Sequence, residues 1–303
     1  MSVANIRPFL TVAGILAVAT VIAVAGSHNG ESVCGIRVFA LCAAIAFAAQ
    51  WLAFIPAYRA HTERFFDLAG SITFVTVAVV GVVAVGNWEP RSLVIATLII
   101  VWAARLGWHL SQRVRASGGD RRFDSIKMHF PSFFLTWTLQ GLWVLLTSAA
   151  AVAAITTAKP EPLDWIAFAG IAIWALGFVL EAVADAQKRA FRSDRANRNR
   201  FIRTGLWAWS RHPNYFGEIV IWVGIAVIAA PALSGWQWVT MVSPVFVFVL
   251  LTRVSGIPIL ERQARARWGK DQDYREYRAA TPVLVPRRPT PHRARQGSET
   301  DLA

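Results

Sequence analysis

Long, nearly uninterrupted apolar blocks constrain the fold of this chain more than any other feature. A helix needs roughly 20 mostly apolar residues to cross the hydrocarbon core of a bilayer. Charged residues make up only 16% of the 303 positions, which is too few for a soluble domain of this size. We therefore predict an all-α, polytopic membrane helical bundle with about eight transmembrane helices, at 8–26, 36–56, 68–86, 92–110, 132–155, 163–184, 216–231 and 238–256.

The two ends of this pattern need separate interpretation. Only Arg7 precedes the first block and the second follows quickly, so we interpret the first as a retained helix, not a signal peptide. The last two blocks are barely separated at 231–235, which leaves two full crossings or one broken hairpin. We predict one transmembrane domain over 1–286, with a disordered basic tail, rich in proline and arginine, at 287–303.

The net charge of +13 is compatible with nucleic-acid binding, but its distribution points to a membrane. With the N-terminus inside, the segments between blocks alternate between rich and poor in basic residues. The outer segments hold only Arg37, Arg91 and Lys159. This asymmetry follows the positive-inside rule and predicts cytoplasmic termini. We expect a bacterial-type inner membrane, anionic lipid headgroups as partners of many basic residues, and no nucleic acid.

The sequence contains none of the common metal or nucleotide motifs. Cys34 and Cys42 are eight positions apart, which suits neither a metal site nor a disulfide framework, so we expect no metal. Two long polar segments, 111–130 and 185–212, are the richest in arginine, and a helix-like polar stretch follows at 258–280. All three are predicted on the cytoplasmic side, where an anionic ligand would meet them together.

The densest group of polar residues lies between 185 and 218. Lys188 and Arg192 are four positions apart and project from one helix face. Pro213 suits the first position of a helix, so the seventh span is predicted to begin there, with Asn214 and Glu218 on one face. A carboxylate one turn inside an apolar helix is costly unless it is paired or faces a polar cavity. Glu218 is thus either a site residue or half of a structural pair with Arg211.

The C-terminal polar stretch adds three further candidates. Glu261 lies on the predicted helix, and Tyr274 and Tyr277 follow three positions apart. A tyrosine pair at this spacing is typical of packing at a membrane interface. The alternative is that one ring contacts a cofactor, and the sequence leaves both interpretations open.

These residues together resemble a known family. The resemblance rests on Lys188, Phe191-Arg192, Gly205-Leu206-Trp207 and the run Ser210-Arg211-His212-Pro213-Asn214-Tyr215-Phe216-Gly217-Glu218. This pattern is similar to the C-terminal domain of the steroid 5-alpha-reductase superfamily, in particular its bacterial DUF1295 branch. It also resembles the NADPH-dependent sterol C14-reductases. Weaker matching pieces, around 66–74, 120–124 and 255–261, extend the resemblance to about 50–286.

The resemblance implies a cytoplasm-facing NADPH site and the reduction of a carbon–carbon double bond in a lipophilic substrate from the bilayer. It places Lys188, Arg192, Arg203, Asn214 and Glu218 along the dinucleotide, with Trp207, Arg211, His212, Tyr215, Glu261 and Tyr274 as further contacts. Arginine forks suit the phosphate oxygens of such a cofactor. Trp207 is available to stack on adenine, and Asn214 with Glu218 offers groups for the nicotinamide carboxamide.

The proton donor is harder to assign, because the Tyr and Glu pair implied by the family is not found here by motif. The candidates from the N-terminal half are Tyr58, Glu63, Asp67 and His109, and Glu218 is a further catalytic candidate. His109 is either a proton donor or a side chain that reaches toward the interface. Gln140 either binds a substrate oxygen or bonds across helices.

Two other classes of function stay open. The first is a methyltransferase similar to the isoprenylcysteine carboxyl methyltransferases, which share a loose Arg-His-Pro pattern. Their cofactor, S-adenosylmethionine, carries no phosphate, so the arginine-rich run 188–203 favours a phosphorylated cofactor. The second is a non-enzymatic lipid-binding membrane protein that retains the fold, and nucleotide binding would distinguish it from both enzymes.

Overall fold

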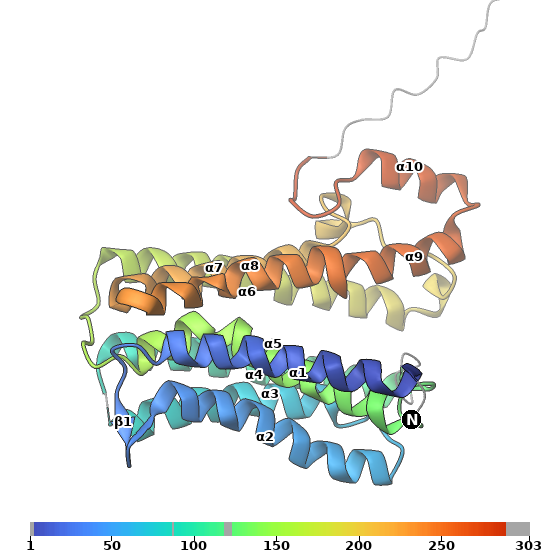
Figure 1. Cartoon of the computed structure of the whole chain (residues 1–303). Helices are drawn as coiled ribbons and strands as arrows, with labels where there is room; N and C mark the ends of the chain where they lie inside the picture. Colours follow the sequence, from blue (N-terminus) through green and yellow to red (C-terminus); the bar gives the residue numbers. More distant parts are fainter. Residues whose placement is uncertain (1–2, 87, 118–122, 289–303) are drawn as a thin grey trace, which may run out of the picture. The chain divides into compact units, whose positions relative to one another are not determined.

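Helices make up most of the computed structural model, which describes residues 3–86, 88–117 and 123–288 (Figure 1). The long helices are α1 (Val3–Gly26), α2 (Val38–Arg59), α3 (Phe66–Val85), α4 (Pro90–Ser117), α5 (Phe130–Ile155), α6 (Trp165–Ser193) and α7 (Pro213–Ala229). They are followed by α8 (Val242–Val249), α9 (Ile257–Trp268) and α10 (Gln272–Ala280). Eight helical stretches in the described part are long and apolar enough to span a bilayer. The predicted all-α membrane protein is therefore confirmed, while the orientation of its termini stays a prediction.

The last two apolar blocks form separate helical stretches of span length, Pro213–Ala232 and Gly235–Trp268. After α7 the chain passes through a short 3-10 turn, Ala230–Ala232, where Pro231 cannot continue the helical hydrogen bonds. A second 3-10 segment, Gly235–Met241, then leads into α8. It starts with a capping box, in which the Ser234 side chain accepts from the Gln237 amide and the Gln237 side chain accepts from the Ser234 amide.

The chain forms two compact units, each of which is described by itself. Unit 1 comprises Met1–Ala172 and Trp222–Val247, and unit 2 comprises Ile173–Ile221 and Phe248–Ala303. The predicted single domain over 1–286 stays a prediction. Of the predicted tail, residues 289–303 lie outside the described part of the chain.

Helix α5 forms the centre of unit 1. It packs against α1, α2, α3 and α4, and 83% of its span is buried, against 28–50% for the other spans. Its second half is rich in alanine, with 149–151 and 153–154 all alanine, so neighbouring backbones approach closely. The other helices of this unit keep apolar faces exposed, as expected where a helix meets lipid.

A small hairpin follows α1, with strands β1 (Ser32–Val33) and β2 (Ile36–Arg37). The two turn residues between them both adopt positive φ, +52° at Cys34 and +79° at Gly35. The guanidinium of Arg37 donates to the carbonyl of Gly30, which itself bridges to Thr157 after α5. This arginine therefore fixes the connection between α1 and α2.

Arg91, another arginine of the predicted outer side, is buried at the start of α4 with only 2% of its surface exposed. Its guanidinium donates to the carbonyls of Glu161 at 3.1 Å, Pro162 at 2.6 Å and Ile228 at 2.6 Å. It also lies 3.0 Å from the carboxylate of Asp164. The Ala167 amide, together with Arg91, holds the pKa of Asp164 below its usual value. Arg91 thus joins three chain segments.

In unit 2, α6 and α7 approach closely at glycines. A Cβ placed on Gly177 would lie 2.7 Å from the Gly217 carbonyl oxygen, so neither position has room for a side chain. Helix α6 runs on to Ser193, well beyond the predicted end of the sixth span at 184. Lys188 and Arg192 therefore lie on a regular helix, as their spacing predicted.

Candidate functional site

The predicted Arg-His-Pro turn is held in place before α7 by a segment that follows α10. The hydroxyl of Ser210, fully buried, donates to the Leu284 carbonyl at 2.7 Å and accepts from the His212 amide at 3.1 Å. The Arg211 amide donates to the Pro282 carbonyl at 2.9 Å. Helix α7 begins at Pro213, as predicted. The turn is therefore held in place by the segment after α10 and by the start of α7, without any ligand.

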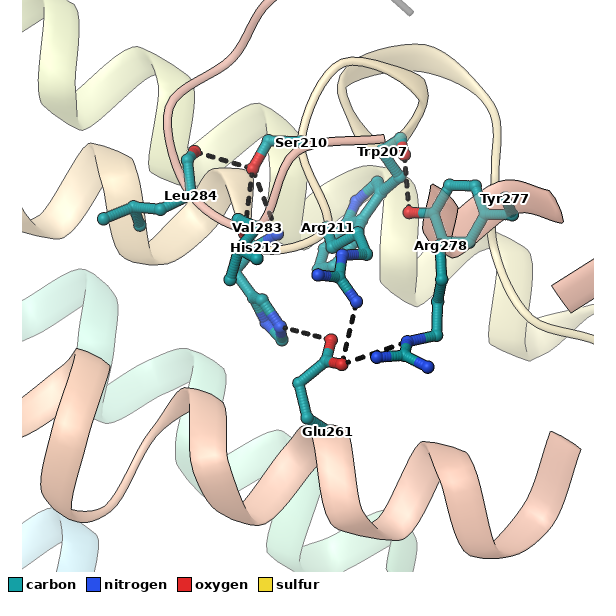
Figure 2. Close-up of polar contacts among 9 residues, drawn as sticks. All are labelled: Trp207, Ser210, Arg211, His212, Glu261, Tyr277, Arg278, Val283 and Leu284. Atoms are coloured by element: carbon teal, nitrogen blue, oxygen red, sulfur yellow. Dashed lines mark hydrogen bonds and ion pairs between the residues drawn. The ribbon is translucent and has the colours of Figure 1, made fainter. Parts of the chain in front are cut away.

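Glu261 on α9 is the centre of the polar cluster that these side chains form (Figure 2). Its Oε2 atom lies 2.8 Å from Arg211 Nη1 and 3.4 Å from Arg278 Nε, and its Oε1 atom lies 3.2 Å from His212 Nε2. The three partners come from the turn before α7 and from α10. One carboxylate thus connects three segments of unit 2.

His212 is neutral in this environment. Burial lowers the pKa of its imidazole below the usual value, although the Glu261 carboxylate opposes the shift. Since a carboxylate only accepts, the Nε2–H donates to Glu261 and Nδ1 is left as an acceptor. Nδ1 of His212 and Nε of Arg211 are both buried and have no hydrogen-bond partner among the described residues. The turn therefore presents one unused acceptor and one unused donor side by side in sequence.

A cavity of about 240 Å³ lies next to this cluster within unit 2. Its cationic wall is built from α6, the segment after it and α9, by Lys188, Arg192, Arg200 and Arg267 in addition to Arg211. Other lining residues are Phe191, Phe201, Ile202, Trp207, His212, Leu260, Glu261, Gln263, Ala264, Trp268, Tyr274 and Tyr277. The cavity thus combines a strongly positive wall with aromatic rings.

The tyrosine pair belongs to this aromatic part. Tyr274 is 3% exposed, and its ring lies 5.1 Å from that of Phe201. The Tyr277 hydroxyl donates to the Trp207 carbonyl at 2.7 Å, and burial raises its pKa well above the usual value. Burial also raises the pKa of Tyr274, so both tyrosines stay protonated at neutral pH, and both form part of the cavity wall.

Seven of the predicted cofactor residues line the cavity, namely Lys188, Arg192, Trp207, Arg211, His212, Glu261 and Tyr274. Arg203 does not; its Nη1 lies 3.1 Å from the Asp273 carboxylate, and its side chain is half exposed. Asn214 donates to Asp185 at 3.2 Å, and it lies with Tyr215 and Glu218 outside the lining. Trp207 is 3% exposed, with Lys188 Nζ 4.4 Å from its ring centre, so adenine would compete with lysine there.

Sequence reasoning missed several residues of this wall. Arg200, Arg267 and Trp268 line the cavity, and Trp268 Nε1 donates to the Asn199 carbonyl at 2.9 Å. The adjacent Arg267-Trp268 pair was the available signal, since the other large apolar residues of α9, Ile257, Ile259 and Leu260, all lie in its first turn. Arg278, which joins Glu261, was also missed.

The candidate proton donors lie in unit 1. Tyr58 on α2 stacks on Phe54 at 5.5 Å and belongs to an aromatic cluster that includes Phe133 and Trp137. Asp67, in the first turn of α3, accepts from the Ser71 hydroxyl through its backbone carbonyl at 3.2 Å. His109 is half-buried on α4. The contacts of these residues do not show whether any of them donates a proton, so their catalytic roles stay predictions.

Gln140 bonds across helices, which was one of its two interpretations. It is 4% exposed on α5, and its Nε2 donates to the Phe66 carbonyl of α3 at 2.7 Å. Its Oε1 has no hydrogen-bond partner within the described residues, so the second interpretation stays open. Glu63, another candidate, pairs with Lys127 at 3.0 Å. In the described residues, no group of three His, Cys, Asp or Glu side chains is placed to hold a metal ion.

Comparisons with known proteins identify the family of the chain. Residues 53–281 match the family described as "Protein of unknown function (DUF1295)". An uncharacterised protein of Schizosaccharomyces pombe is 26% identical over 198 residues, 54% of this chain and 57% of the relative. The "3-oxo-5-alpha-steroid 4-dehydrogenase 1" of Bos taurus is 30% identical over 130 residues, 41% and 44% of the two chains. That of Rattus norvegicus is 24% identical over 161 residues, 52% and 56%.

The chain spans about half the length of the curated relatives that it matches. No solved structure matches it. The family match covers most of the sequence, including α3 to α10 and the whole cavity in unit 2. The chain therefore belongs to the DUF1295 family, with distant homologues among the steroid 5-alpha-reductases.

Proposed function

We propose that the protein is an NADPH-dependent membrane reductase that reduces a carbon–carbon double bond in a lipophilic substrate. The observation that carries the proposal is the cavity of unit 2, where Lys188, Arg192, Arg200 and Arg267 line one pocket beside the Arg-His-Pro turn. The distant 3-oxo-5-alpha-steroid 4-dehydrogenases support the class of oxidoreductase. Substrate and cofactor are part of the proposal.

The cationic wall suits the phosphates of the dinucleotide. NADPH carries a pyrophosphate and a 2′-phosphate, and arginine binds such oxygens through two parallel hydrogen bonds. Arg192 and Arg267 both line the cavity and are exposed, so their guanidinium groups are accessible to a ligand. A cavity of about 240 Å³ is smaller than most complete ligand sites, so we assign it one half of the dinucleotide.

The Arg-His-Pro turn offers polar atoms for a neutral part of the cofactor. Arg211 Nε can donate and His212 Nδ1 can accept, and both are buried without a partner in the described chain. A group that donates and accepts at once, such as a carboxamide or a hydroxyl, fits both atoms. Glu261 supports this role, because its contact with His212 Nε2 fixes the tautomer that leaves Nδ1 free to accept.

The bound cofactor would supply hydride, and the protein's own residues would bind it, orient it and exclude water. The second hydrogen of the product is a proton, for which Tyr58, Asp67, His109 and Glu218 are the candidates. Gln140 Oε1, buried and unsatisfied by the described residues, is the candidate contact for a polar group of the substrate. We propose that the cavity opens to the cytoplasm, where NADPH is available.

Ligand-dependent thermal stability tests the proposal. A ligand that binds the native state at 100 times its Kd stabilises it by about 2.7 kcal/mol. The purified protein is melted in detergent with NADPH, NADH, S-adenosylmethionine or no ligand. We expect a rise in Tm with NADPH that is smaller in Arg192→Ala and Arg267→Ala. Arg262→Ala is the matched control, because Arg262 is an exposed arginine of α9 outside the cavity lining.

The other outcomes separate the alternatives. A shift with S-adenosylmethionine alone would replace the reductase by a methyltransferase. The absence of a shift with every nucleotide would favour a non-enzymatic lipid-binding protein. If NADPH shifts the wild type and all three arginine variants equally, the cationic wall is not the phosphate site.

A further inference from the structure

An open groove of about 430 Å³ lies between α3 and α4 in unit 1, apart from the polar cluster described above. Its walls are Leu68, Ser71, Ile72, Val75 and Thr76 on α3 and Ala103, Ala104, Gly107, Trp108, Ser111 and Gln112 on α4. At 1.5 Å per helical residue, these stretches are about 12 and 14 Å long. The groove is therefore long, and it follows the axes of two membrane-spanning helices.

Small residues create the groove. Ala103, Ala104 and Gly107 leave a shallow floor on α4, and a Cβ on Gly107 would lie 3.0 Å from that of Ser71. The rim is made of large apolar side chains that remain exposed, at 66% for Trp108 and 56% for Ile72. Since both helices are candidate spans, this rim and floor meet the hydrocarbon region of a bilayer.

The chemistry of the lining selects a hydrocarbon occupant. The hydroxyls of Ser71 and Thr76 donate to carbonyls of their own helix, at 3.2 and 2.9 Å. These two groups need no partner from a ligand, and the rest of the lining is apolar until Ser111 and Gln112 near the end of α4. A ligand with a buried carbonyl or hydroxyl would lose its hydrogen bonds to water without replacement in the middle of this groove.

The end near Ser111 and Gln112 has the character of a headgroup region. Tryptophan prefers the level of the lipid headgroups, and Trp108 is the exposed aromatic ring one turn before this end. In the sequence, the segment 111–130 that continues from here has five basic and two acidic residues. Such a segment attracts anionic lipids.

We propose that this groove is a binding site for one acyl chain of an anionic phospholipid, whose headgroup lies at the Ser111–Gln112 end. The lipid is retained in addition to the annular bilayer lipids, and it fills the space that the small residues of α4 leave open. The site goes beyond the proposed reductase activity, because its lining includes neither a residue of the unit 2 cavity nor one of the candidate proton donors.

Lipid counting on a groove-filling variant tests this site. Ala104→Leu adds three carbons at an exposed floor position, and Ala48→Leu makes the same change at an exposed position of α2 outside the groove. Each protein is reconstituted into nanodiscs of phosphatidylcholine and phosphatidylglycerol, transferred to mild detergent and measured by native mass spectrometry. We expect one retained phosphatidylglycerol on the wild type and on Ala48→Leu, and at least about a tenfold smaller lipid-bound fraction for Ala104→Leu.

Folding and alternative occupants are read in the same experiment. If Ala104→Leu does not fold, Ala104→Val is measured in its place, because its two added carbons enter the same space. Equal retention in the groove and control variants would overturn the proposal, as would a wild type without retained lipid. Retention of a neutral sterol or polyprenol from a cell extract in place of phospholipid, or a dimer that Ala104→Leu dissociates, would overturn it as well.

Discussion

Removal of the buried Arg91 guanidinium should destabilise the protein more than any change at an exposed arginine. Arg91→Ala leaves the carbonyls of Glu161, Pro162 and Ile228 without their donor and removes the partner of Asp164. Hydrogen bonds that involve a charged group contribute about 1.5–3 kcal/mol each. The contributions do not add in full, since Asp164 is about one-third exposed and can be solvated. Loss of one partner of a buried pair costs about 3–5 kcal/mol, which is the magnitude that we expect here.

The melting temperature in detergent, followed by tryptophan fluorescence, measures this loss. At about 2–4 °C per kcal/mol, the Tm of Arg91→Ala should fall by roughly 6–20 °C. Arg91→Lys should also be destabilised, because a single ammonium group cannot bond three carbonyls and a carboxylate at once. Arg262→Ala is the matched control and should change stability by less than about 0.5 kcal/mol.

The Arg91→Ala substitution should not change the orientation of the protein in the membrane. Arg91 belongs to the predicted outer side, so its removal strengthens the asymmetry of basic residues and leaves the orientation unchanged. A Tm of Arg91→Ala within about 2 °C of the wild type corresponds to a loss of stability of only about 0.5 kcal/mol. Such a result would show that the three carbonyls find other partners. The interpretation of Arg91 as a structural link would then be wrong.

Three further predictions concern the candidate site. Arg192→Ala should weaken NADPH binding about tenfold or more in a titration, whereas Arg203→Ala, whose side chain faces Asp273, should weaken it less; the reverse order would move the phosphate site to Arg203. Glu218→Gln should lower turnover more than expression, and wild-type turnover would leave Glu218 a structural role. His212 has a lowered pKa when folded and about 6.5 when unfolded, so below pH 6.5 the unfolded state binds the proton first. Stability should therefore decrease as the pH is lowered through this region, and His212→Gln should remove that part of the pH dependence.

The spans and the start of α7 were predictable because they depend on local sequence. Block length alone gave the eight spans, and Pro213 marked the first residue of α7. Helices α4 and α6 continue beyond the predicted ends of their spans at 110 and 184, since charged residues such as Lys188 end an apolar block without ending a helix. Helix length and membrane thickness are separate properties.

The partners within the site were not predictable in the same way. Arg211 was considered as a partner of Glu218, seven positions away, but its ion pair is with Glu261, fifty positions along the chain. Likewise Arg267 faces the cavity with Lys188 and Arg192 only because α9 returns to α6. Local spacing defines which residues share a face, whereas the second wall of a cavity depends on tertiary packing.

Hydrogen bonds connect the segment after α10 to the turn before α7. Pro282, Leu284 and Arg287 each bond to the segment 209–211 immediately before α7. Exopeptidase trimming that stops beyond Arg288 leaves all of these bonds, so it should not affect the Arg-His-Pro turn. Trimming past Pro282 removes all three bonds, and the turn then loses its contacts with the segment after α10. Residues 282–287 therefore hold the turn in place, and a tag or fusion placed directly after residue 281 would remove their bonds to it.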